Sequence, residues 1–213
     1  MLSRAAGDTM LDVDGRLDAA DIDRLAALHS TTMTSSVLGR MGVGLLARYY
    51  RWLVASPHEW LAVARGDAGL VGAAVLSFDP ARVLQRFASH APLAFAAAVG
   101  ASLLRDRTLR QETCAYLRER MAGDRETPAA PELLQIFVDA AQQDRSVGSG
   151  LLQHVEAYLR TRNVDCYYAR TLAADNARAL GFYERRGFRR VRELHFCGSR
   201  YVLMNRTVRG EPR

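Results

Sequence analysis

The hydrophobic residues in the first part of the chain repeat at helical spacing. Over 18–29 they recur three and four positions apart, which predicts a helix. The same spacing predicts a second helix over 38–53, and Ser35 or Ser36 is a suitable N-terminal cap for it. Residues 1–16 are mostly polar, and we expect them to form a mobile leader outside the core.

Beyond these helices the pattern changes to short apolar runs that alternate with further helical segments. Two runs joined by the turn 65–69 predict an antiparallel strand pair at 60–64 and 69–78. The later pattern predicts strands at 132–138 and 164–172, helices at 147–161 and 176–186, and closing strands at 188–194 and 200–206. This alternation indicates one α/β domain that spans residues 1–213.

Residues 79–130 interrupt the alternation. Helical periodicity continues over 81–88, 91–104 and 108–121, where apolar blocks alternate with arginines. The segment 123–131 contains two prolines and is predicted to be a loop. We therefore expect a helical insertion between the strand that ends near residue 78 and the strand at 132–138.

Composition restricts the classes of protein to consider. The chain has 213 residues, of which 49% are hydrophobic, and this is enough for a sizeable core. Cys114, Cys166 and Cys197 lack metal-ligand spacing, and their odd number argues against a disulfide framework. We expect no metal site and a reduced, cytoplasmic protein. No apolar run approaches the ~18 residues that span a bilayer, and an apolar signal region is lacking.

The net charge of +6 comes from arginines and favours an anionic partner. Helix-turn-helix spacing, zinc ligands and an aromatic–basic RNA signature are all lacking, so we do not expect nucleic acid as the partner. An arginine-rich composition also follows from a GC-rich genome. The five histidines are scattered, and no Ser/His/Asp order emerges that would suggest a hydrolase.

The most informative motif lies between residues 138 and 152. The apolar run that ends at Val138 predicts a buried strand, and apolar residues at helical spacing begin at Leu151. Between them lies a turn rich in glycine, serine and aspartate. Backbone N–H groups in the first turn of a helix lack intrahelical acceptors and lie at the positive end of its dipole. The turn is a candidate site for a pyrophosphate, although many such turns bind nothing.

A second motif follows, from Asn176 through Tyr183-Glu-Arg-Arg to Gly187-Phe188. Together the two motifs resemble the GNAT superfamily of acyl-CoA N-acyltransferases. The second signature of that family, an Asn before a short helix that ends in Tyr-Glu-x-x-Gly-Phe, is complete here.

The first signature, Gln/Arg-x-x-Gly-x-Gly/Ala, can be read from Gln143 or from Arg145. The Gln143 register keeps the family's usual distances to the flanking strand and helix. It places Ser146 where the family prefers glycine, so Ser146 should fit if its φ is negative.

The resemblance implies an α/β fold with a mixed, mostly antiparallel twisted sheet, helices on both faces, and acetyl-CoA as co-substrate. In the family, the strand before the turn separates from its neighbour, binds the pantetheine arm and polarises the thioester. The implied cofactor-binding residues are Ile136, Phe137, Val138, Gln143, Asp144, Arg145, Ser146, Val147, Gly148, Ser149 and Asn176. Gln143 would brace the turn, and Asn176 would serve equally well as a helix cap.

The resemblance also suggests the catalytic groups. Tyr183 is the candidate general acid, because a phenol is protonated at neutral pH; the alternative is core packing. Glu132 matches the catalytic Glu of some family members, and alternation would place it on one face with Leu134, Ile136 and Val138. The alternatives are a solvated Glu132 and a water relay as the base.

The acceptor remains open at this level. An insertion at 79–130 would lie beside the family's acceptor cleft, so we expect a lid whose arginines meet an anionic small-molecule amine, such as a nucleotide-linked amino sugar. A homodimer surface and a membrane-surface patch are the other interpretations of the insertion. A protein N-terminus or lysine as acceptor, or a non-catalytic acyl-CoA-binding module, are the alternative functions.

Overall fold

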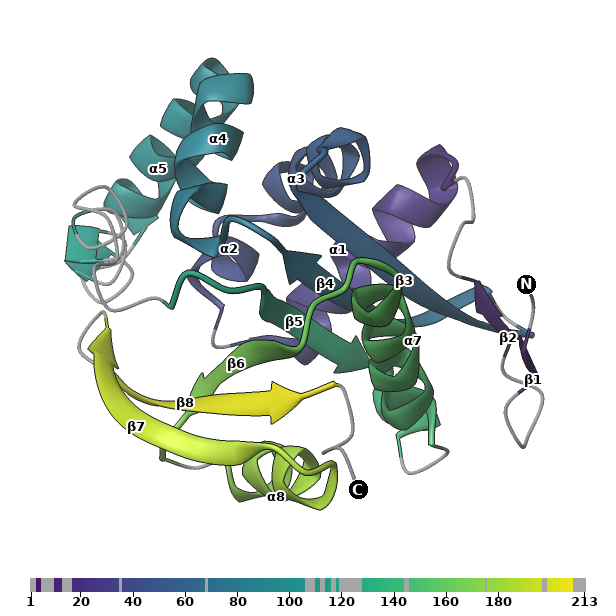
Figure 1. The fold of residues 1–213 in the computed structure, drawn as a ribbon. Coiled ribbons are helices and arrows are strands. Elements are labelled where there is room, and N and C mark those ends of the chain that lie inside the picture. The colour runs from purple at the N-terminus through teal and green to yellow at the C-terminus, as the bar shows by residue number, and fades with distance from the viewer. Residues whose placement is uncertain are drawn as a thin grey trace, which may run out of the picture.

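A computed structural model gives the fold of the chain (Figure 1). It describes residues 3–4, 10–12, 17–34, 36–67, 69–105, 110–111, 114–115, 118, 128–143, 146–174, 176–196 and 199–208. The sequence-predicted helix over 108–121 lies mostly outside these residues. Every helix in the described part of the chain is too short or too polar to cross a membrane.

In the described part of the chain, one twisted sheet contains eight strands in the order β1-β2-β3-β4-β5-β6-β8-β7. Among the strands of the described residues, only the β5–β6 pair is parallel, which confirms the expected mixed, mostly antiparallel sheet. The strands are β1 (Ser3–Arg4), β2 (Met10–Asp12), β3 (Glu59–Gly66), β4 (Gly69–Ser77), β5 (Glu132–Val138), β6 (Cys166–Leu172), β7 (Arg189–Phe196) and β8 (Ser199–Thr207).

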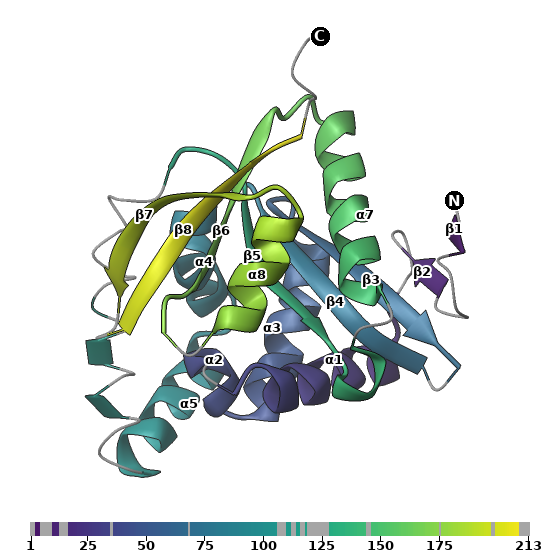
Figure 2. The same cartoon turned by 90° about the horizontal axis from the view of Figure 1, so that it is seen from below.

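Helices cover both faces of the sheet, as Figures 1 and 2 show. One face carries α1 (Ala19–Thr32), α2 (Val37–Arg40), α3 (Val43–Ala55), α4 (Val83–His90) and α5 (Pro92–Arg105). The opposite face carries α7 (Val147–Thr161) and α8 (Ala177–Arg185). Short 3-10 turns η1 (Pro80–Arg82) and η2 (Ala140–Gln142) complete the elements. Each face has its own apolar core, so the sheet is buried between two layers.

The N-terminal part differs from the prediction in two places. Strands β1 and β2 lie within residues 1–16, where we expected only a leader, and β2 extends the sheet beside β3. The single helix predicted over 38–53 is divided into α2 and α3, because Gly42 between them has a φ of 112° and interrupts the helical backbone. Ser36 caps α2 as expected, with Gly39 N donating to Ser36 Oγ over 3.2 Å.

Strand β5 contains a bulge that the sequence did not reveal. Val75 pairs with Gln135 and Leu76 with Leu133, so Leu134 is the extra residue. Consequently Leu133, Ile136 and Val138 pack on the α7–α8 side, whereas Leu134 and Phe137 pack on the α1–α3 side. The expected shared face of Leu134 with Ile136 and Val138 is therefore wrong, because strict alternation does not continue through a bulge.

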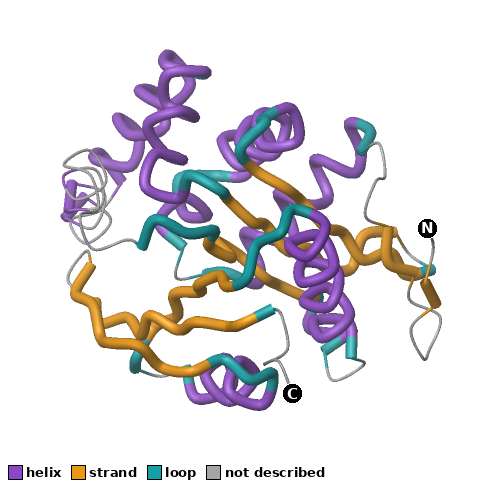
Figure 3. Tube along the Cα trace, in the orientation of Figure 1, coloured by secondary structure: helices purple, strands orange, loops and turns teal. Residues whose placement is uncertain are grey.

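The insertion contributes α4 and α5, which stand beyond α3 at one end of the molecule (Figure 3). A partly buried ion-pair network anchors α4 to the sheet. The Arg86 guanidinium contacts both Glu59 on β3 and Asp79 after β4, and Ser77 Oγ donates to Glu59 Oε1 over 3.1 Å. Because Ser77 pairs directly with Glu132, this network places α4 beside the beginning of β5.

Candidate active site

Strands β5 and β6 separate soon after they meet. Their register covers only Glu132 with Tyr168 and Leu133 with Ala169, whereas β5 pairs with β4 along its whole length. We call the region beyond these two pairs the β5–β6 divergence. Strand β5 is therefore paired on its β4 side and has no register partner on its β6 side from Leu134 onward. The expected separation of the two strands is confirmed.

The turn after β5 lies at the wide end of this divergence. The Gln143 side chain braces it, because Gln143 Nε2 donates to the Val138 carbonyl oxygen over 3.3 Å. Ser146 has φ 61° and ψ 6°, so the condition of a negative φ is not met. Serine occupies a left-handed position that favours glycine, which accounts for the family's preference at this place. Asp144 and Arg145 lie outside the described residues.

Helix α7 begins directly after Ser146. Gly150 N donates to Ser146 O, so this bond closes the first helical turn. The preceding N–H groups of Val147, Gly148 and Ser149 have no intrahelical acceptor by helix geometry, and the first turn contains no acidic residue. The arrangement favours an anion, because N–H groups and the positive end of the helix dipole coincide.

Gly148 explains how three elements meet at this turn. A Cβ at Gly148 would lie 3.6 Å from the Phe182 ring on α8 and 3.7 Å from a Val138 methyl. The start of α7 therefore packs closely on both the end of β5 and α8. Arg186, which follows α8, donates to Ser149 Oγ and brings a guanidinium to the same turn. Sequence reasoning missed Arg186, because only the fold brings it to Ser149.

Asn176 stands at the N-terminal cap position of α8, but its side chain does not cap the helix. Asn176 Nδ2 instead donates to Thr171 Oγ1 on β6 over 2.6 Å. This bond ties the beginning of α8 to the strand on the other side of the divergence. The cap interpretation is therefore correct for the backbone position and wrong for the side chain.

Tyr183 projects from α8 into the core of the α7–α8 face. It is 6% exposed and contacts the rings of Phe182 and Phe188 edge to face. Burial raises the pKa of the Tyr183 phenol well above its ordinary value, and the nearby negative charge of Glu132 raises the pKa further. The phenol therefore stays protonated at physiological pH and senses the Glu132 carboxylate.

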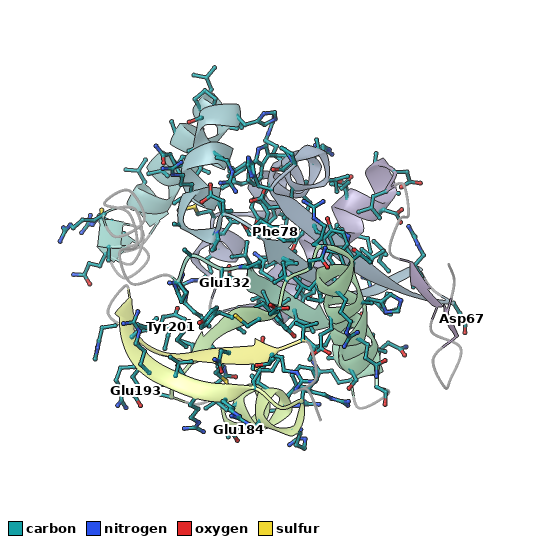
Figure 4. All side chains as sticks on the ribbon, viewed as in Figure 1. Asp67, Phe78, Glu132, Glu184, Glu193 and Tyr201 are labelled. Carbon is teal, nitrogen blue, oxygen red and sulfur yellow. The ribbon has the colours of Figure 1, made fainter. Side chains whose placement is uncertain are left out.

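Glu132, which is labelled in Figure 4, is buried at the narrow end of the divergence. Arg170 on β6 binds it in a bidentate ion pair, with 2.9 Å from Nε to Oε1 and 2.8 Å from Nη2 to Oε2. The interpretation of Glu132 as a solvated residue is wrong, because its side chain is only 4% exposed. Arg170 lies 38 residues later in the chain, and no local pattern marked it as a partner.

Three other titratable side chains have structural roles. Asp139 accepts from Ala141 N and forms an ion pair with Arg24, and exposed Glu184 pairs with Arg190. His29 is fully buried, with Nδ1 2.8 Å from Tyr50 Oη. Burial lowers the pKa of His29 to about 4, so it is neutral at pH 7. Within the described residues, no group of three or more His, Cys, Asp and Glu side chains is arranged to hold a metal ion.

Comparison with known proteins shows which family has this sequence pattern and fold. The model of the acetyltransferase (GNAT) family matches residues 40–188. No curated protein matches the sequence. Among solved structures, an acetyltransferase of the GNAT family from Desulfovibrio desulfuricans is 14% identical with a TM-score of 0.58, over 94% of this chain and 99% of that one.

Two further structures are similar over nearly all of their lengths. The ribosomal-protein-S18-alanine N-acetyltransferase from Escherichia coli is 12% identical, with a TM-score of 0.56 over 96% of each chain. The PaiA N-acetyltransferase from Thermoplasma acidophilum, solved in complex with coenzyme A, is 10% identical with a TM-score of 0.56 over 92% of this chain and 98% of that one. At these identities the similarity establishes the fold.

Proposed function

The chain belongs to the acetyltransferase (GNAT) family and is an acyl-CoA N-acyltransferase; from this premise we propose that it transfers an acetyl group from acetyl-CoA to the primary amine of a small molecule. The observation that carries the proposal is the β5–β6 divergence with the α7 turn at its wide end. An unpaired strand edge suits an extended amide-containing arm, and a helix N-terminus suits a diphosphate.

In the proposed complex, the backbone N–H groups of 147–149 hold the diphosphate, and Gln143 keeps the turn in place. The arm lies along Ile136, Phe137 and Val138, which have no register partner on β6. The Val138 carbonyl oxygen already accepts from Gln143 Nε2, so the arm pairs with the other backbone groups on this edge. A β5 N–H group then polarises the thioester carbonyl. Asp144, Arg145, Ser146 and Asn176 complete the proposed cofactor-binding set.

The reaction is a direct displacement. The neutral amine nitrogen attacks the thioester carbon, a C–N bond forms, and the C–S bond breaks. Tyr183 gives its phenolic proton to the departing thiolate. Its high pKa keeps the proton available across the physiological pH range.

The base must take a proton from the amine. An ionised carboxylate offers about four acceptor positions, and Arg170 occupies one on each Glu132 oxygen. Glu132 therefore retains positions for a water molecule, and we propose that it acts through one. If Glu132 is this base, a Glu132→Gln variant should lose kcat at neutral pH and regain it as the pH approaches the pKa of the amine acceptor. An unchanged kcat would leave the role to a water relay that does not involve Glu132.

The acceptor is proposed to be an amino sugar or a nucleotide-linked amino sugar, with the insertion as the lid over it. Support comes from the Arg86 network, which holds α4 beside the beginning of β5. Arg86 itself is committed to Glu59 and Asp79, so it is not among the arginines expected to meet an anionic acceptor. Arg82 is exposed at the start of α4 and takes that role in the proposal.

Thiol release from acetyl-CoA tests the function directly. The panel contains amino sugars, nucleotide-linked amino sugars, and peptides with a free N-terminal alanine or an internal lysine. Saturable release with a sugar amine supports the proposal. Turnover with the peptides alone would instead make the protein a protein N-acetyltransferase, and coenzyme A binding without any turnover would indicate a non-catalytic module.

A further inference from the structure

The Glu132–Arg170 pair closes the narrow end of the β5–β6 divergence. Backbone pairing between the strands stops at Leu133 and Ala169, and the next residue of β6, Arg170, reaches back to the first residue of β5. The side chains of the pair are 4% and 11% exposed, so the closure lies inside the protein. Two parallel hydrogen bonds fix both side chains, since a guanidinium and a carboxylate match each other as planar forks.

The proposed function gives this closure a position relative to the cofactor. The diphosphate site follows Val138, and the divergence narrows toward Leu133, five residues back along β5. Five strand residues span about 17 Å at a rise of about 3.3 Å per residue. An arm that starts at the turn and follows β5 therefore carries its thioester toward Glu132 and Arg170.

We propose that the Glu132–Arg170 pair forms the end wall of the acyl site and restricts the donor to short acyl chains. This inference rests on the proposed function and extends it to the acyl group. Additional methylene groups would have to displace a buried, doubly hydrogen-bonded ion pair or lie against its charges, and both are unfavourable. Arg170 is thus a specificity-determining residue that touches the donor's acyl end.

The test compares acyl-chain preference between enzymes that differ only at this wall. For the wild type and for Glu132→Ala/Arg170→Ala, kcat/KM is measured with acetyl-, propionyl-, butyryl- and hexanoyl-CoA at a fixed amine concentration. The ratio of kcat/KM for butyryl-CoA to that for acetyl-CoA should rise about tenfold or more in the double variant, because one methylene alone alters such ratios by ~10-fold or more. The ratio does not depend on the concentration of folded enzyme.

Matched variants separate the effect of the end wall on acyl-chain length from effects of these residues on catalysis or stability. Glu132→Gln keeps the volume of the wall, so its chain-length ratio should stay near that of the wild type even if kcat falls. Glu156→Met/Arg206→Met removes another partly buried ion pair, on the α7 face, whose atoms lie 3.0 Å apart. It should leave the ratio unchanged. If the double alanine variant does not fold, Glu132→Gln/Arg170→Ala opens the wall from one side without leaving a charged glutamate behind.

The outcomes are distinct. A raised ratio in the opened variants alone supports the end wall. A ratio equal to that of the wild type in both opened variants, with acetyl transfer still measurable, overturns the inference but leaves the proposed function intact. A wild-type enzyme that transfers no acyl group from coenzyme A to any amine contradicts the proposed function itself.

Discussion

Tyr183 on α8 and Glu132 at the beginning of β5 are electrostatically coupled, although they belong to different elements. Burial, and then the charge of Glu132, raise the pKa of the phenol. A proton donor therefore lies within electrostatic reach of a carboxylate that Arg170 holds in place. We therefore assign Tyr183 as the general acid. Glu132 is the base that accepts the proton of the amine through a water molecule.

Replacing Tyr183 by phenylalanine should lower kcat by ~10²-fold and leave the KM for acetyl-CoA nearly unchanged, because only the proton donor is lost. Steady-state kinetics check both values. Tyr167→Phe is the matched control, since Tyr167 is also buried in the same core and donates its hydroxyl to Glu156. Equal kcat values for the wild type and Tyr183→Phe would remove Tyr183 from the mechanism.

Replacing Ser146 by glycine should stabilise the protein by roughly 0.5–1 kcal/mol, because a left-handed φ of 61° strains any residue with a Cβ. Urea unfolding measures the change. Asn163 at the end of α7 has a φ of 55° and provides the comparison. Asn163→Gly should gain less, since asparagine tolerates this conformation well. Destabilisation by Ser146→Gly would mean that the serine side chain contributes contacts that outweigh the strain.

Stability should fall as the pH is lowered from about 6.5 to about 4, in part because of His29. Its folded pKa of about 4 lies below its unfolded value near 6.5, so the unfolded state binds the proton first in this window. The His29 contribution is complete above about pH 6.5 and falls by about 3 kcal/mol by pH 4. Urea unfolding at several pH values should show a shallower loss for His29→Gln than for wild type, whereas exposed His58→Gln should follow the wild type.

Removing Arg86 should destabilise the fold by about 3–5 kcal/mol, because Glu59, with a fully buried side chain, would lose its charged partner. Chemical unfolding of Arg86→Met measures this loss. The double variant Glu59→Gln/Arg86→Met should recover much of it, since no buried charge is then left unpaired. If the double variant is as unstable as the single one, the network contributes through packing rather than through charge.

Local sequence patterns predicted the elements well where the pattern has sharp limits. Strand β5 spans Glu132–Val138 and helix α7 spans Val147–Thr161, as expected, because a proline precedes the strand and the glycine-containing turn separates the two. The turn before α7 and the short helix α8 lie where the family signature predicted them. The bulge at Leu134 was not predicted, because its position depends on how β5 pairs with β4 and not on the sequence of β5 alone.

The partners of the functional residues were not predictable from local spacing. Arg170 reaches Glu132 and Arg186 reaches Ser149 only because β6 and α8 fold back onto the cofactor-binding elements. Gln143 was predicted to brace the turn, and it contacts the carbonyl of Val138 only five residues away. Short-range contacts were thus accessible to sequence reasoning, and contacts fixed by topology were not.

Amide hydrogen exchange with and without coenzyme A shows where the cofactor lies on the backbone, and so decides whether it occupies the β5–β6 divergence and the start of α7. Bound coenzyme A should slow exchange in two segments, Leu134–Val138 on the side away from β4 and Val147–Ser149 at the start of α7. Saturation with coenzyme A that leaves exchange in both segments unchanged, or no binding at millimolar cofactor, would contradict the account.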